Sequence, residues 1–145
     1  MKILVTGLPG SGKTVFSNKL FNLLEKNDTP VVCYNGDRLR SQYNDWDFTE
    51  VGRSRQLIRM TNFADECDDN DIIAICDFVC PKNSYREYLN PDITIWIDTI
   101  KESKYEDTNQ LFEEPDKYDV RIIDFEQNEI ENVIRLINAK RHICN

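Results

Sequence analysis

Positive charge is scarce in this chain. Its 18 Lys and Arg residues stand against 26 Asp and Glu residues, so the formal net charge is −8 and the pI is near 4.7. A general nucleic-acid binder needs a basic face for the phosphates, and the deficit therefore disfavours nucleic acid as a partner. A local basic site remains compatible with this composition.

Long hydrophobic runs, paired cysteines and histidine are also lacking. No stretch reaches the ~18 apolar residues of a membrane-spanning helix, so we expect no membrane association. None of the 5 cysteines forms a C-x-x-C pair, which predicts reduced thiols in a cytoplasmic protein rather than a zinc or redox site. Residues 1–6 lead directly into a glycine-rich motif, so we expect no signal peptide. The single histidine, His142, lies in a charged C-terminal run, and we assign it no catalytic role.

What is present is an alternation of short apolar runs and amphipathic segments, over a length of 145 residues that suits a single domain, 1–145. The expected strands are 2–6, 31–34, 72–76, 92–97 and 120–123. The expected helices are 13–26, a short one after residue 37, about 50–67, one or two turns at 84–89, and a final one around 130–137. Residues 99–119 are polar and show no clear period. This order predicts an α/β fold in which helices cover both faces of a parallel sheet.

A glycine-rich motif follows the first expected strand. It reads G-x-x-x-x-G-K-[ST] and comprises Gly7, Leu8, Pro9, Gly10, Ser11, Gly12, Lys13 and Thr14. Glycines let successive backbone N–H groups turn toward phosphate oxygens, and the helix that follows adds its N-terminal donors. Lys13 supplies a positive charge for the β- and γ-phosphates, and the Thr14 hydroxyl suits Mg²⁺. We therefore predict that this motif binds ATP with Mg²⁺, in a P-loop NTPase-like three-layer sandwich with a five-stranded, mainly parallel sheet.

The class of reaction follows partly from missing motifs. The D-x-x-G and N-K-x-D motifs of GTPases are absent, and the chain is short for a motor ATPase with its own sensor elements. These absences favour a small-molecule kinase, in which a hydroxyl of the acceptor attacks the γ-phosphate of ATP.

A second informative segment, residues 35–40, follows the second expected strand. Parallel strands end at one edge of the sheet, so we expect Asp37 to face the glycine-rich loop and to act on an attacking hydroxyl. Five of the nine arginines lie between residues 38 and 59, which indicates a negatively charged acceptor. Arg55 and Arg59, four residues apart, fit a solvated helix face better than an acceptor site.

Together these residues resemble the adenylyl-sulfate (APS) kinases, whose second motif reads D-G-D-x-x-R where this chain has residues 35–40. Residues 48–53 resemble that family's G-F-S-x-x-D-R segment, residues 78–81 its F-I-S-P turn, and residues 96–99 its V-D-T segment. The resemblance runs from residue 3 to about residue 100. It implies phosphorylation of the 3′-hydroxyl of adenylyl sulfate by MgATP.

The resemblance also implies a role for each matching residue. Asp37 and Lys13 would be catalytic, with Asp37 acting on the acceptor hydroxyl. Arg40 and Arg53 would hold the phosphosulfate of the acceptor. The residues around its adenine would be Phe48, Phe78, Val79, Cys80 and Pro81. Besides this small-molecule partner, a homodimer is an expected assembly, since APS kinases are often dimers.

Several positions depart from the family pattern. They are Asn35 in place of Asp, Gly52 in place of the Asp before the second acceptor arginine, Gln56 in place of Asn, and Cys80 in place of Ser. The connection between residues 40 and 48 is about one residue short. The family's long basic lid is absent, because the expected short lid region, 98–119, holds eight acidic residues and three lysines. This region resembles a short variant of the family often found in phage genomes, which would place the protein in the cytoplasm of a host cell.

The missing basic lid keeps two other functions open. Lid lysines normally neutralise phosphate charge during transfer, so the acceptor is alternatively another nucleotide, a sugar or a nucleic-acid end. A non-catalytic nucleotide-binding regulator is the other alternative. Asp77, after the third expected strand, is either a Mg²⁺-orienting carboxylate or part of a structural turn. By analogy with the fold, we expect residues 124–128 to lie against the nucleotide base.

Overall fold

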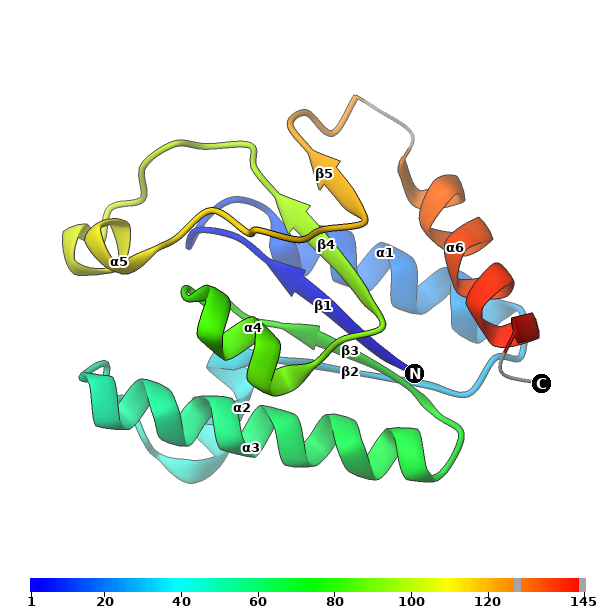
Figure 1. The fold of residues 1–145 in the computed structure, drawn as a ribbon, viewed down its shortest axis with the longest axis horizontal. Helices are drawn as coiled ribbons and strands as arrows, with labels where there is room; N and C mark the ends of the chain where they lie inside the picture. Colours follow the sequence, from blue (N-terminus) through cyan, green and yellow to red (C-terminus); the bar gives the residue numbers. More distant parts are fainter. Residues whose placement is uncertain (127–128, 144–145) are drawn as a thin grey trace.

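The computed structural model describes residues 1–126 and 129–143 of the chain, and within them lie five strands and six helices (Figure 1). The strands are β1 (Lys2–Thr6), β2 (Val31–Asn35), β3 (Ile73–Asp77), β4 (Ile93–Ile97) and β5 (Val120–Ile122). The helices are α1 (Lys13–Lys26), α2 (Gly36–Tyr43), α3 (Glu50–Asp69), α4 (Asn83–Leu89), α5 (Glu106–Leu111) and α6 (Glu129–Ile143).

The strands form one sheet in the order β2-β3-β1-β4-β5, and every neighbouring pair is parallel. The predicted α/β sandwich is therefore confirmed, with a sheet that is parallel throughout its described strands. Because the strands are parallel, the segments that follow β1, β2, β3 and β4 lie at the same edge of the sheet. Ligands of open α/β sheets bind at this edge.

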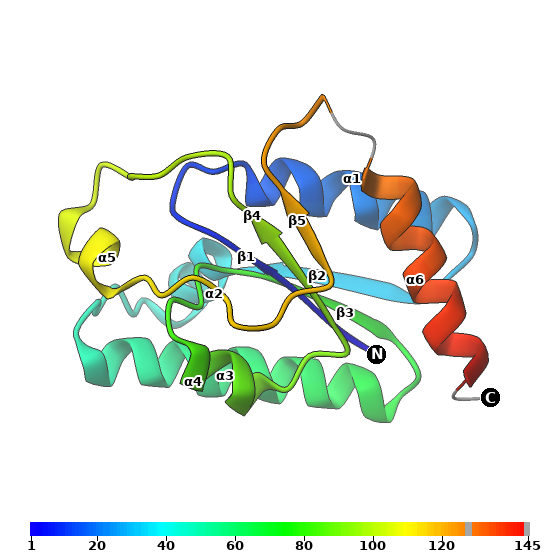
Figure 2. The same ribbon diagram turned by 45° about the horizontal axis from the view of Figure 1, so that its top comes forward.

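The two faces of the sheet carry separate hydrophobic cores. Ile3 and Val5 pack with α1 and α6 on one face, whereas Leu4 packs with α2, α3 and α4 on the other. This follows from the period of two in a strand, which sends successive side chains to opposite faces. Figures 1 and 2 show the sheet between these two helical layers, with α5 at one end of the molecule and the C-terminal end of α6 at the other.

Two local features differ from the sequence expectation. Residues 99–119 show no clear period in the sequence, and no helix was predicted in them, but they contain α5. Helix α2 begins directly after β2, without an intervening turn, because the side chain of Asn35 accepts a hydrogen bond from the Arg38 N–H at 2.7 Å and caps the helix. Asp37 therefore lies in the first turn of α2.

The cysteines that the structure describes are unpaired, and they are Cys33, Cys67, Cys76 and Cys80. Cys144 lies outside the described residues. Burial raises the pKa of the Cys80 thiol to about 12. Among residues 1–126 and 129–143, none of the helices combines the length and the apolar character that crossing a membrane requires.

Candidate active site

The glycine-rich loop connects β1 to α1 at the carboxyl edge of the sheet. Gly10 and Gly12 have φ values of 80° and 102°, in the left-handed region that glycine adopts without a steric penalty. The loop turns back on itself through a hydrogen bond from the Ser11 N–H to the Leu8 carbonyl at 3.1 Å. This geometry presents the N-terminus of α1, with its unpaired N–H groups, to the space above the loop.

The end of β4 supports this loop from below. A Cβ atom added to Gly7 would lie 2.5 Å from the Ile97 carbonyl oxygen, so only glycine permits this close approach. The Thr99 hydroxyl donates to the Ser11 carbonyl at 2.6 Å. The sequence comparison included Thr99 in the segment that resembles the family's V-D-T, but it predicted no role for this residue.

Lys13, Thr14 and Asp77 form the centre of the phosphate side. The Lys13 ammonium donates to the Leu8 carbonyl at 3.0 Å, and the Thr14 hydroxyl donates to Asp77 Oδ2 at 2.8 Å. Burial lowers the pKa of Lys13, and the charges of Asp77 and Asp37 oppose this shift. Burial also raises the pKa of Asp77, which is only 2% exposed at the end of β3. A buried carboxylate therefore lies beside the hydroxyl of the loop, and together they present two hard oxygen ligands.

Asp37 lies on the same edge as the glycine-rich loop. Its side chain is exposed at the start of α2, and its charge acts on Lys13. Its charge also acts on Arg40 of the same helix, where it opposes the lowering of the pKa by burial. The structure thus brings Asp37 close enough to Lys13 and Arg40 for its charge to act on both.

Arg40 and Arg53 are both buried, and both lie against the ring of Phe48. The guanidinium carbons are 4.2 Å and 5.6 Å from the ring centroid, respectively, within the range of cation–π contacts. Arg40 donates to the carbonyls of Asp45 and Asp47 at 3.0 Å each. Arg53 donates to the Phe48 carbonyl at 2.8 Å. The sequence-predicted arginines therefore converge on one aromatic side chain.

The turn at 78–81 closes the acceptor side. Phe78 is buried, and its Cβ would lie 3.0 Å from a Cβ added to Gly36 at the start of α2. The Val79 carbonyl accepts a hydrogen bond from the Thr6 hydroxyl at 2.6 Å. Cys80 adopts a φ of 45° and is buried. Arg86 donates to the carbonyl of Pro81 at 3.3 Å, which fixes the turn on α4.

The sequence profile of the adenylylsulphate kinase family matches residues 1–121. The chain belongs to the adenylylsulphate kinase family. A probable adenylyl-sulfate kinase of Aeropyrum pernix is 36% identical over 88 residues, which are 60% of this chain and 48% of that protein. The chain thus spans about half the length of this curated relative.

Solved structures share the fold at lower sequence identity. The APS kinase CysC of Mycobacterium tuberculosis, in complex with AMPPNP and APS, has a TM-score of 0.74 and 19% identity over 94% of this chain and 96% of its own. A sugar kinase from Janibacter has a TM-score of 0.69 and 19% identity over 94% of both chains. Because both kinases match equally in extent, this likeness shows the fold and does not select an acceptor.

The segment 98–119, which was expected to be a short lid, joins β4 to β5 and contacts Arg53. Helix α5 stands apart from the sheet (Figure 1), yet its Thr108 hydroxyl accepts a hydrogen bond from Arg53 at 3.1 Å. The Asp107 carboxylate lies 3.5 Å from the same guanidinium. A carboxylate and a hydroxyl from the acidic lid therefore lie against an arginine that the family resemblance assigns to the phosphosulfate.

Gln56, which replaces the family's Asn, lies in the buried wall between α2 and α3. Its amide donates to the Gly36 carbonyl at 2.8 Å, and this contact fixes which end of the amide is nitrogen. The Gln56 side-chain oxygen is buried and accepts no hydrogen bond within the described part of the chain.

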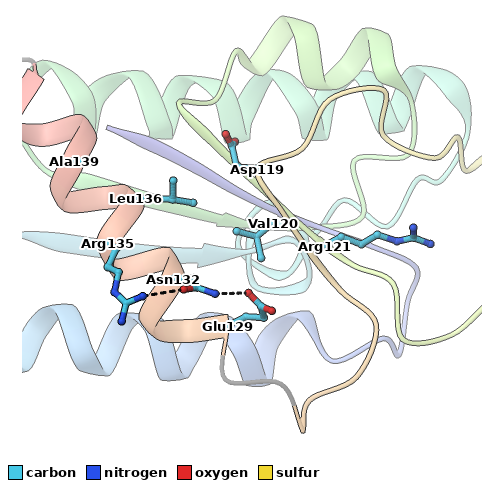
Figure 3. A pocket seen from close by; sticks show the side chains of 8 residues that line it. All are labelled: Asp119, Val120, Arg121, Glu129, Asn132, Arg135, Leu136 and Ala139. Carbon is cyan, nitrogen blue, oxygen red and sulfur yellow. Dashed lines mark hydrogen bonds between the residues drawn. The ribbon is translucent and has the colours of Figure 1, made fainter.

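Two grooves flank helix α6, and they differ in their relation to the glycine-rich loop. A groove of 540 Å³ lies between β5 and α6, and its walls include Asn132 and Arg135, which hydrogen-bond to each other (Figure 3). No residue of the loop lines it. A second groove, of 300 Å³, is lined by Val15 and Phe125 beside the start of α1. A Cβ added to Gly12 would lie 2.6 Å from the Phe125 ring, so that ring lies directly against the loop.

Phe125, which belongs to the segment 124–128 expected to lie against the nucleotide base, adjoins the phosphate loop. Residues 127 and 128 lie outside the described residues. Whether this segment contacts a nucleotide base stays a prediction.

Proposed function

We propose that this chain is an ATP-dependent kinase domain that transfers the γ-phosphate to the 3′-hydroxyl of adenylyl sulfate. The observation that carries the proposal is the meeting of Lys13, Asp77 and Asp37 at one sheet edge, next to the arginine pair on Phe48. Family membership supports the choice of acceptor.

In the proposed reaction, the backbone N–H groups of residues 7–14 and the Lys13 ammonium bind the phosphates of ATP. Asp37 accepts the proton of the attacking hydroxyl while the oxygen of that hydroxyl forms a bond to the γ-phosphorus. The bond between that phosphorus and the β–γ bridging oxygen breaks, and ADP leaves.

Thr14 and Asp77 fit the needs of Mg²⁺, because a hydroxyl and a carboxylate are hard oxygen ligands. Among the described residues there is no cluster of three or more His, Cys, Asp or Glu side chains that could hold a metal. Mg²⁺ is typically bound by one or two carboxylates together with substrate phosphates, which suits this sparse set. When bound, the ion would neutralise charge on the β- and γ-phosphates.

The acceptor would lie on the other side of Asp37. Arg40 and Arg53 would hold its phosphosulfate, with Arg53 exchanging the Asp107 carboxylate for an anionic oxygen of the acceptor. Phe48 and the turn of Phe78, Val79, Cys80 and Pro81 would enclose its adenine, with Phe48 as the exposed face of that pocket.

The test is an assay of the purified protein with ATP, Mg²⁺ and adenylyl sulfate, with ADP and the 3′-phosphorylated product measured separately. We expect both products in equal amounts, and neither in the Lys13→Ala and Asp37→Ala variants. A panel of sugars, nucleotides and nucleic-acid ends runs in parallel. Turnover with one of these compounds but not with adenylyl sulfate would show that the proposed acceptor is wrong and that the protein is nevertheless a kinase.

A second candidate function is a nucleotide-binding regulator without turnover. The specific observation that favours it is the acidic lid, whose Asp107 lies against Arg53 where a basic lid would neutralise phosphate charge. ATP-dependent thermal stabilisation with no turnover on any acceptor would select this function.

A further inference from the structure

The connection between α2 and α3, residues 44–49, carries Phe48 and is held by an unusual number of arginines. The Asp45 carboxylate accepts hydrogen bonds from Arg55 Nε at 2.9 Å and from Arg59 Nη1 at 2.7 Å. The Asp47 carboxylate accepts one from Arg55 Nη2 at 2.9 Å. Arg55 therefore bridges two aspartates that are two residues apart in the connection. We call the set of Asp45, Asp47, Arg55 and Arg59 the clasp.

The backbone of the connection is held from its other side. Arg40 donates to the carbonyls of Asp45 and Asp47 at 3.0 Å each, so the same two residues are gripped through main chain and side chain. A Cβ added to Gly52 would lie 2.1 Å from the Asp47 carbonyl oxygen. The family's aspartate at this position would therefore collide with the connection, and glycine lets the shortened loop lie directly on the first turn of α3.

The clasp joins the 44–49 connection to α3. Asp45 is the buried partner, with 11% of its side chain exposed, whereas Arg55 is 41% exposed. The hydrogen bonds from Arg55 keep the pKa of Asp45 well below its usual range, so the carboxylate is charged at neutral pH. The Arg59 guanidinium carbon also lies 4.1 Å from the Tyr43 ring centroid, which ties the clasp to the end of α2.

We propose that Arg55 and Arg59 are positioning residues, which fix the 44–49 connection through Asp45 and Asp47 and thereby hold Phe48 against the acceptor. The inference rests on the proposed function for the acceptor, but the ordering of the connection does not. In this role the two arginines are not merely a solvated helix face, and they do not contact the acceptor directly.

Chymotrypsin tests the ordering without any substrate. The enzyme cuts after aromatic residues, and Trp46 and Phe48 lie within the connection, whereas Tyr118 is an exposed aromatic residue elsewhere and serves as the internal reference. In Arg55→Gln we expect cleavage after Trp46 and Phe48, identified by mass spectrometry, to rise about tenfold relative to cleavage after Tyr118, since several charge-assisted hydrogen bonds are lost together. Arg135→Gln is the control, because Arg135 is an exposed arginine of α6 whose partner Glu131 is 4.0 Å away. Equal cleavage ratios in wild type and Arg55→Gln would overturn the inference.

Steady-state kinetics test the link to the acceptor. Arg55→Gln, Arg59→Gln and Asp45→Asn should each raise KM for adenylyl sulfate about tenfold while KM for ATP stays within about twofold. Arg55→Lys should restore only part of the loss. The ammonium keeps the positive charge, but it cannot bridge both aspartates as a guanidinium does. Asp45→Asn is decisive, since it frees Arg59 and leaves Arg55 with only its bond to Asp47. If they bound the acceptor directly, KM for adenylyl sulfate would fall or stay unchanged, and the positioning role would be wrong.

The two proposals fail in different ways. A wild-type protein with no turnover on adenylyl sulfate would overturn the proposed function, and the cleavage ratios would still decide whether the clasp orders the connection. Faster cleavage together with an unchanged KM for adenylyl sulfate would show that the connection is loosened but that Phe48 does not contact the acceptor, which overturns the positioning role.

Discussion

The phosphate side and the acceptor side of this crevice are built in different ways. On the phosphate side, the loop is shaped by left-handed glycines, and its hydrogen bonds come from its own backbone or from strand ends, as Lys13 to Leu8 and Thr99 to Ser11 show. On the acceptor side, the positions of Arg40 and Arg53 depend on the 44–49 connection and on α5. The first arrangement is set by one short motif. The second needs several segments to fold against each other, so it can differ between members of one family.

The largest effect is expected from a substitution on the phosphate side. Lys13→Ala should lower kcat by about 10³-fold, because it removes the positive charge that faces the β- and γ-phosphates. The melting temperature without ligand should not fall, since the buried ammonium loses hydration in the folded state. ADP release and thermal melting check both outcomes. Lys26→Ala, exposed at the end of the same helix, is the control, and an equal loss in that variant would contradict the assignment.

Asp37 joins the two sides, and its removal should have the next largest effect. Asp37→Asn keeps the shape of the side chain but cannot accept the proton, so kcat should fall by about 10²-fold while KM for both substrates changes little. The Asp77→Asn variant is the matched comparison. It should instead raise the Mg²⁺ concentration needed for half-maximal rate, because Asp77 lies beside Thr14 rather than beside the acceptor. The same Mg²⁺ dependence in both variants would contradict the separate roles of Asp37 in proton transfer and of Asp77 in Mg²⁺ binding.

A glycine tests how tightly the acceptor side is packed. Alanine usually stabilises a helix relative to glycine, by roughly 0.5–1 kcal/mol. Gly52→Ala should reverse that sign and destabilise the protein by about 1–3 kcal/mol, because the new Cβ would lie 2.1 Å from the Asp47 carbonyl oxygen. Denaturant unfolding measures the change. Ser54→Ala in the same helix is the control, and a stability gain in Gly52→Ala would mean that the connection does not rest on α3.

The same contrast explains what could be predicted from the sequence. The strands, α1, the glycine-rich loop and the position of Asp37 follow from hydrophobic periodicity and from one contiguous motif, so they could be predicted. The bonds of Arg53 to Thr108 and of Arg59 to Asp45 join residues 55 and 14 positions apart, and a single sequence does not encode such pairs locally. Helix α5 escaped prediction because its six residues are mostly polar and carry no apolar period.

A milder change tests the acidic lid. Asp107→Asn should lower KM for adenylyl sulfate by about two- to fivefold, because an exposed carboxylate 3.5 Å from Arg53 competes with an anionic acceptor for about 1 kcal/mol or less. Competition of this kind leaves kcat unchanged, and initial-rate kinetics separate the two constants. Glu102→Gln removes one charge from the same lid region and should leave KM within error. An increase in KM on loss of Asp107 would mean that the lid helps to hold the acceptor.

The smallest expected effect is a pH dependence of stability. Hydrogen bonds from Arg55 and Arg59 lower the pKa of Asp45 in the folded protein, so this stabilisation is complete above the unfolded pKa of about 3.9 and is lost as the pH falls below it. The difference in melting temperature between wild type and Asp45→Asn should therefore be constant from about pH 7 to pH 5 and shrink below about pH 4. Melting curves across this range measure it. A difference that shrinks between pH 7 and pH 5 would point to another titrating group.

The enclosed cysteines give the protein a built-in reporter of its own opening. A thiol is alkylated as the thiolate, and the pKa of about 12 at Cys80 leaves almost none of that form near neutral pH while the fold is intact. Cys80 lies in the 78–81 turn, so its rate of labelling by iodoacetamide measures how often that turn opens to solvent. Slower labelling in the presence of a candidate acceptor would register occupancy of the neighbouring crevice without any need for catalysis.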